Sequence, residues 1–179
     1  KIGGATLEAD LGVGIHADSR LVFNGTSTIG SSLSNLTAGV LLTSGAIANR
    51  VGTQAGQVQW SGSGGFAAGD DGLTLNFGAI SSSQGQALTW NAGGCVTNGA
   101  TLRFGSNYAT GVVTLVNDVN LNGLNGRIAV YNNAAVDTDW AVIGGKFSGG
   151  TLEVNDTGYA GALYFTNQNS LTGLTVHNG

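Results

Sequence analysis

The chain of 179 residues contains no proline and no methionine, and only 9% of its residues are charged. A strand with neighbours on both sides must donate its backbone N–H groups, which proline cannot do, so the missing proline suits a paired sheet. The six Lys and Arg residues are scattered in a chain of net charge -4. Nucleic-acid binding needs clustered basic side chains, so this class of partner is excluded. No apolar run approaches the ~18 residues of a membrane-spanning helix, and we therefore expect no membrane span.

Cysteine is almost absent as well, because Cys95 is the only one in the chain. A single cysteine excludes an intrachain disulfide and a thiolate metal cage, and we expect Cys95 to be a small buried apolar residue. The spacing of an EF-hand and the calcium-binding GGxGxD nonapeptide are also missing. The sequence therefore predicts no cofactor. It begins at Lys1 without a signal peptide, which we interpret as a processed or partial chain of a secreted protein.

Glycine is abundant, with 32 residues, and asparagine, serine and threonine fill most of the remaining polar positions. Each glycine costs about 1 kcal/mol inside a helix, so we expect no helix. Short apolar or alternating runs that end in Gly or Asn recur instead, and such runs are typical of strands followed by turns. They are TLEAD (6–10), RLVFNG (20–25), GVLLTSG (39–45), QVQWSG (57–62), LTLNFG (73–78), ALTWNAG (87–93), TLRFGS (101–106), VVTLVND (112–118), RIAVYNN (127–133), WAVIGG (140–145), TLEVND (151–156), ALYFTN (162–167) and LTVHNG (174–179).

Two all-β architectures fit such evenly spaced strands: an antiparallel β-sandwich and a parallel β-solenoid of stacked coils. Near identity between distant segments favours the solenoid, because stacked coils reuse one local solution. When Lys1 is aligned with Lys146, GGATLEAD matches GGTLEVND, and LVFNG (21–25) matches LYFTN (163–167). We therefore predict a single β-solenoid domain over residues 1–179, with the antiparallel sandwich as the alternative.

The asparagine and glycine residues have a physical role in a solenoid. Tight corners between strands need left-handed backbone, which Gly adopts without steric cost and Asn more readily than most residues. Asn side chains at equivalent corners would form ladders of amides along the stack. Four aromatic residues that recur late in successive runs are interpreted as stacked core side chains rather than a ligand platform. They are Trp60, Phe77, Trp90 and Phe104.

A family resemblance rests on the stretch VQWSGSGGFAAGDDGLTLNFG (58–78), followed by ALTWNAGG, TNGATLRFGS, VNLNG and SGGTLEV. With these motifs in this order, the chain resembles the autotransporter-associated β-strand repeat proteins over residues 55 to 179. The resemblance implies a right-handed parallel β-helix in a bacterial protein that is secreted or displayed at the cell surface. It implies no catalytic residues.

The two ends of the chain are predicted to be uncapped, since neither carries an amphipathic helix, a charged strand or a proline. A solenoid end is a row of unpaired strand edges that templates another chain. The end LTVHNG followed by the beginning KIGGATLEAD reads like WAVIGG followed by KFSGGTLEVND. We expect copies to stack head to tail into a filament, or the chain to be one unit of a longer covalent array. The expected assembly interface consists of Lys1, Ile2, Leu7, Leu174, Val176, His177, Asn178 and Gly179.

The predicted function is thus that of a non-catalytic, extracellular structural fibre or surface adhesin, with itself and cell-surface or matrix glycans as partners. The alternative is a polysaccharide-active or carbohydrate-binding β-helix. In VDTDW, Asp137 and Asp139 lie two apart and would share one side of a strand beside Trp140, which would stack on a sugar. The same carboxylates are the candidate metal ligands. A solvated turn is the competing interpretation of this stretch. Asp70 and Asp71 are interpreted as a turn.

Overall fold

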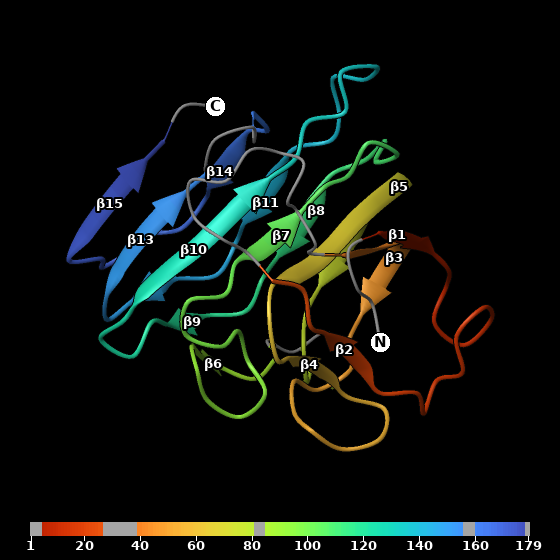
Figure 1. The fold of residues 1–179 in the computed structure, drawn as a ribbon, viewed down its shortest axis with the longest axis horizontal. Coiled ribbons are helices and arrows are strands. Elements are labelled where there is room, and N and C mark those ends of the chain that lie inside the picture. The colour runs from red at the N-terminus through yellow and green to blue at the C-terminus, as the bar shows by residue number, and fades with distance from the viewer. Residues whose placement is uncertain (1–4, 27–38, 81–84, 156–159, 178–179) are drawn as a thin grey trace.

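The structure, a computed structural model of the chain, describes residues 5–26, 39–80, 85–155 and 160–177. These residues form strands and turns and contain no helix, as the glycine content predicts (Figure 1). Consequently, none of them belongs to a helix that could cross a membrane. In chain order the strands are β1 (Thr6–Glu8), β2 (Leu21–Phe23), β3 (Val40–Ile47), β4 (Val58–Trp60), β5 (Gly64–Leu75), β6 (Leu88–Thr89), β7 (Leu102–Phe104), β8 (Val113–Leu115), β9 (Val119–Asn120), β10 (Asn125–Val130), β11 (Ala141–Ile143), β12 (Phe147–Ser148), β13 (Thr151–Val154), β14 (Leu163–Phe165) and β15 (Gly173–Val176).

The pairs among these strands are parallel throughout. The largest sheet has ten strands and divides at β5, whose first residues pair with β7 and whose last residues pair with β8. We call β7, β10, β13 and β15, which pair in that order, the first series, and β8, β11 and β14 the second series. On the other side of β5, the sheet continues through β3 to β1. The parallel arrangement confirms the predicted strand direction, and the antiparallel sandwich is wrong.

The chain passes through these sheets in a repeating order. It runs through β7, β8 and β9, then through β10, β11 and β12, and then through β13 and β14. β9 and β12 join β6 in a separate three-stranded sheet, while β2 and β4 form a two-stranded one. We call each passage through the first series, the second series and the three-stranded sheet a coil. Successive coils lie side by side, and the large sheet curls around the interior like a half-barrel (Figure 1).

Buried apolar and more exposed side chains alternate along the short strands, and the buried ones form the core. In β8, Val113 and Leu115 are buried, while Thr114 between them is partly exposed, because successive side chains of a strand point to opposite faces. Leu115 is the register partner of Leu75 on one neighbouring strand and of Ile143 on the other, and all three side chains are buried. Each fully buried side chain of this size contributes about 1.5–3 kcal/mol relative to exposure. The coils are therefore held together by stacked apolar side chains.

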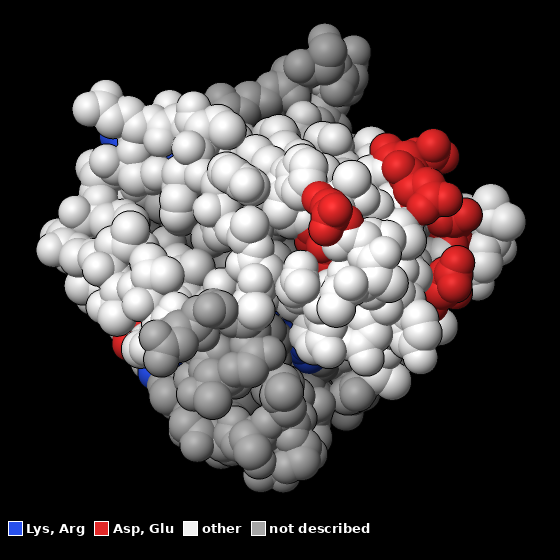
Figure 2. All heavy atoms as spheres, turned by 90° about the horizontal axis from the view of Figure 1, so that it is seen from above, with Lys and Arg blue, Asp and Glu red and all other residues white. Residues whose placement is uncertain are grey.

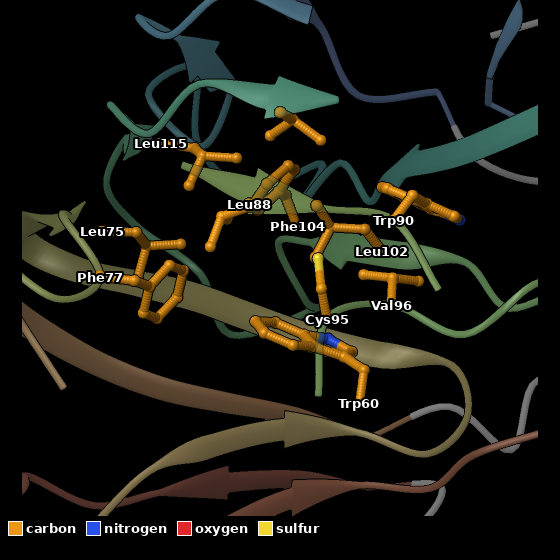
Figure 3. Close-up of a pocket in the computed structure, with 11 residues that line it drawn as sticks. Trp60, Leu75, Phe77, Leu88, Trp90, Cys95, Val96, Leu102, Phe104 and Leu115 are labelled. Carbon is orange, nitrogen blue, oxygen red and sulfur yellow. The ribbon is translucent and has the colours of Figure 1, made fainter. Parts of the chain in front are cut away.

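Aromatic rings fill the interior of the earlier coils. The rings of Phe23 and Trp60 are stacked at 5.4 Å, and Phe77 meets Trp60 edge to face at 5.8 Å. Each of the four predicted core aromatics is buried, as is Cys95, so these predictions are confirmed. The side chains in Figure 3 enclose a void of about 10 Å³. Such a volume is no larger than a single water requires, so this space is packed core rather than a ligand site.

Left-handed backbone occurs at the corners, as predicted. Asn122 and Gly123 form one corner with φ angles of 57° and 75°, and Asn91 and Asn155 have φ angles of 61° and 51°. Asparagine tolerates this region better than other side chains with a Cβ, so the corners close without proline.

Corner asparagines also tie one coil to the coil before it. The Asn117 side chain, which is fully buried, accepts a hydrogen bond from the Phe77 backbone N–H at 2.9 Å. Its amide donates to the backbone carbonyls of Phe77 and Gln86, each at 2.9 Å. Asn169 accepts from the Phe147 N–H at 2.7 Å in the same manner. These amides therefore bond to backbone groups of the neighbouring coil, in place of the expected ladder of amide on amide, because each corner leaves a backbone donor facing the next.

The near repeat between the two ends is only partly reproduced in space. Thr6 begins β1 and Thr151 begins β13, and both strands belong to the large sheet. Followed across the intervening strands, however, the register aligns Thr6 with Ala129 of β10. Thr151 instead pairs directly with Asn125 of β10. LVF forms β2 in the two-stranded sheet, while LYF forms β14 in the second series. Similar segments thus form strands at both ends but occupy different positions, because the pairing of a strand depends on its neighbours rather than on its own residues.

Candidate functional site

The described part of the stack ends at β15 without a covering strand. Within the described residues, β15 pairs with β13 and with no other strand. Leu174 is level with Leu152, and Val176 is level with Val154. Leu152 and Val154 are 1% and 5% exposed, whereas Leu174 and Val176 are 53% and 67% exposed. β15 therefore continues the interior of the stack without being covered (left in Figure 1).

β14 ends the second series in the same way. It pairs with β11 alone among the described strands. Leu163 and Phe165 continue the interior positions of Ala141 and Ile143 and are only partly buried. The Phe165 ring meets the buried Phe147 ring edge to face at 6.2 Å. Leu171 is half-buried beside them. We define the open end as the interior-facing side chains Leu163, Phe165, Leu171, Leu174 and Val176.

The opposite end is partly covered. β1 pairs with β3 alone in the described part of the chain, and its Leu7 is 44% exposed. The segment that follows β1 packs Ala9, Leu11 and Ile15 against the core. Of the predicted assembly residues, the structure thus places Leu7, Leu174, Val176 and His177 at the two ends. Lys1, Ile2, Asn178 and Gly179 lie outside the described residues.

The two histidines are not brought together in one chain. His16 is exposed near β1, and its Nδ1 accepts a hydrogen bond from the Asp18 backbone N–H at 3.2 Å. His177 is exposed after β15, where its backbone N–H donates to Val154 at 3.0 Å. No group of three His, Cys, Asp or Glu side chains close enough to hold a metal ion occurs in residues 5–26, 39–80, 85–155 and 160–177.

An open hollow lies beside the second series. It has a volume of about 390 Å³. Its aromatic side chains are Trp140, just before β11, and Tyr164 of β14, whose rings meet edge to face at 6.1 Å. Tyr164 is 54% exposed. The described residues that line it are Asn132, Ala134, Val136, Asp137, Asp139, Trp140, Ala162 and Tyr164.

Asp137 and Asp139 both line this hollow, but their environments differ. Residues 131–140 form a loop, so the assumption that both carboxylates share one side of a strand is wrong. Asp137 is exposed, whereas Asp139 is 5% exposed and accepts a hydrogen bond from the Asn133 backbone N–H. Asp139 thus closes the loop. The sequence pattern identified Trp140 and both aspartates but missed Tyr164, whose only signal is an aromatic residue at the outward position of ALYFTN.

Acidic side chains gather along one side of the molecule, with few basic side chains in view (Figure 2). Asp70 and Asp71 are exposed within β5, where pairing with β3 stops at Ala68 and resumes at Leu73. The four intervening residues, GDDG, form a bulge inside strand β5, so the turn predicted for Asp70 and Asp71 is wrong. The open end, by contrast, is apolar.

Comparison with known proteins identifies no relative: no family model, no curated protein and no solved structure matches this chain.

Proposed function

We propose that this chain is a non-catalytic structural protein of the bacterial cell exterior, built as a right-handed β-solenoid whose open end accepts a second copy. Copies stacked head to tail would form a rigid fibre or a surface adhesin. The parallel coils support the solenoid, and the resemblance to autotransporter-associated repeat proteins supports the location. The proposal assigns no catalytic residue and no cofactor.

The observation that carries the proposal is the contrast between β13 and β15. Leu174 and Val176 have the same orientation as the buried Leu152 and Val154, yet more than half of each side chain is exposed. One further coil would bury both and would pair the backbone N–H and C=O groups along β15. Unpaired strand edges recruit other strands unless they are blocked by charge, proline or a cover. β15, with the sequence GLTV, carries neither charge nor proline.

The proposed occupant is a second copy because the other end of the chain offers a matching edge. β1 also has one partner among the described strands, and its Leu7 faces the interior side with 44% exposure. A contact between the two different ends is heterologous and does not close, so it generates a filament. A longer covalent array would join the same two surfaces and would be distinguished by the length of the native polypeptide.

Electron microscopy of the purified chain tests the assembly. Filaments with a repeat near 4.8 Å along their axis are expected, since this is the spacing of stacked strands. Leu174→Lys combined with Val176→Lys should abolish them, because burying unpaired charges costs far more than the contact contributes. The matched control is Thr175→Lys, which lies between them and faces outward; filaments should persist. Dispersed particles of the unaltered chain at high concentration would refute the proposal.

Cysteine cross-linking tests which residues meet at the junction. The register of the first series, followed from Val176 through Gly64, reaches Ala5 beside β1. Ala5→Cys with Val176→Cys should therefore give disulfide-linked multimers, since stacked residues lie within the ~4.4–6.8 Å that a disulfide spans. Thr6→Cys with Val176→Cys should not, because these side chains face opposite sides. The pair Leu7→Cys and Leu174→Cys would cross-link instead if the junction follows the sequence repeat. Failure of both interior pairs would count against stacking.

A further inference from the structure

The hollow formed by Trp140, Tyr164 and the loop of residues 131–139 has the properties of a small-molecule site. Its volume, about 390 Å³, lies within the range of roughly 300–1,000 Å³ that is usual for such sites. The interior void of about 10 Å³ offers no alternative inside the stack. Unlike the open end, this hollow lies on the outer side of the second series, so a ligand there would not occupy the interior-facing side chains of the open end.

The aromatic pair is positioned by the sheet. Tyr164 is level with Val142, and Ala141 at the start of β11 faces the interior. Trp140, one residue earlier, therefore projects outward, as Tyr164 does from the adjacent strand. Their edge-to-face contact at 6.1 Å holds both rings while leaving Tyr164 54% exposed. A ring face kept open to water beside a hollow is suited to stacking against a flat, partly apolar ligand.

The loop that closes the hollow is held in place by the preceding coil. The Asn133 amide donates to the Ala109 carbonyl at 2.8 Å, and the Thr138 hydroxyl donates to the Thr110 carbonyl at 2.6 Å. The hydrogen bond from Asn133 to Asp139 fixes the two ends of the loop relative to each other. The hollow is therefore formed before any ligand binds, which lowers the entropic cost of binding.

The polar side of the hollow determines the ligand class. Asp137 is exposed, and its carboxylate has no hydrogen-bond partner in the part of the chain that the structure describes. The Asn132 side chain also lines the hollow and offers both a donor and an acceptor. A carboxylate accepts hydrogen bonds from hydroxyl groups and repels anions. A sugar ring combines an apolar C–H face with hydroxyl edges, which matches this division into aromatic and acidic sides.

We propose that the hollow binds an uncharged sugar residue, with the ring against Tyr164 and Trp140 and its hydroxyls on Asp137 and Asn132. Calorimetric titration with cellotriose, maltotriose and chitotriose tests this, with trigalacturonate as the anionic comparison. We use the Leu174→Lys/Val176→Lys variant, so that the result does not depend on assembly. At least one neutral trisaccharide should bind with a dissociation constant below about 1 mM, and trigalacturonate should bind at least about tenfold more weakly.

Variants test whether a sugar ring stacks specifically on Tyr164. Tyr164→Ala should weaken binding by at least about tenfold, because it removes the exposed ring face. Tyr108→Ala is the matched control, since Tyr108 is 68% exposed and does not line the hollow; its effect should stay below about twofold. Asp137→Asn should reduce the discrimination against trigalacturonate. If no neutral trisaccharide binds at 10 mM, or if Tyr164→Ala binds as the parent does, the sugar site is refuted while the fibre proposal is untouched.

Discussion

β13 and β15 are neighbours in the same series, with a leucine and a valine at the same two positions, yet they differ almost completely in burial. Leu152 and Val154 are covered on both sides by other strands, since β13 lies between β10 and β15. Leu174 and Val176 contact the stack on one side only. Burial at these positions is therefore decided by the presence of a following coil rather than by the residue. The described stack thus has a covered interior and, at β15, a strand with one partner only.

Truncating the two leucines should give the largest difference between these strands. Leu152→Ala should lower the free energy of unfolding by about 2–5 kcal/mol, because it leaves a cavity in packed core. Leu174→Ala should lower it by less than about 1 kcal/mol in dilute solution, since its side chain is already half exposed. Urea denaturation of both variants measures this. Equal losses in dilute solution would mean that Leu174 is covered in the isolated chain, which would contradict the open end.

The corner asparagines allow the same comparison for polar groups. Asn117→Ala should cost about 1–3 kcal/mol, because the buried Phe77 N–H loses its acceptor and two carbonyls lose a donor. Asn169→Ala, at a position that follows β14 in the incomplete last coil, should cost less, about 0.5–1 kcal/mol, since Asn169 is only half-buried and water can replace it. Thermal or urea unfolding of the two variants provides the measurement. A larger loss for Asn169 would show that the last coil is as tightly covered as the middle ones.

The pH dependence of the free energy of unfolding should reveal that the Cys95 thiol is buried. Burial raises the pKa of its thiol from 9.0 to about 11, partly offset by a backbone hydrogen bond from Val96. The unfolded chain loses this proton near pH 9 and the folded chain does not, so stability falls between about pH 9 and pH 11. At pH 10 the loss should be on the order of 1 kcal/mol relative to pH 7. Cys95→Ala should remove this part of the decrease, and an unchanged pH profile in that variant would place the thiol outside the core.

The strand content could be predicted because it depends on local sequence. Each of the apolar runs expected to be a strand contains one, from TLE at β1 to LTV at β15. The first half of β5 was missed because GGFAAG has too much glycine for a strand pattern. A Cβ at Gly64 would lie 2.7 Å from the Gly39 carbonyl oxygen, so the close approach of two coils requires glycine there. The short strands β9 and β12 were missed for a related reason, since Asn and Gly flank them.

The candidate sites were predicted in part. The sequence predicts uncapped ends and a sugar-binding group at Trp140 with its neighbouring aspartates. The structure places Trp140, Asp137 and Asp139 around one hollow, while sugar binding and assembly stay predictions. The different environments of Asp137 and Asp139 were not predicted, because a spacing of two residues describes a strand and this segment is a loop. Tyr164 was not associated with Trp140 because the two belong to different coils.

Local residue patterns are enough to predict that the chain forms strands without helices, that Trp60, Phe77, Trp90 and Phe104 belong to a core, and that its corners need Asn and Gly. These properties follow from backbone preference and from apolar alternation, which act within a few residues. Long-range packing is needed to explain which strands lie side by side, why Leu174 is exposed where Leu152 is buried, and why Tyr164 faces the hollow beside Trp140. These outcomes depend on the register between segments far apart in the chain, and that register is set by the packing of all the coils together rather than by any single segment.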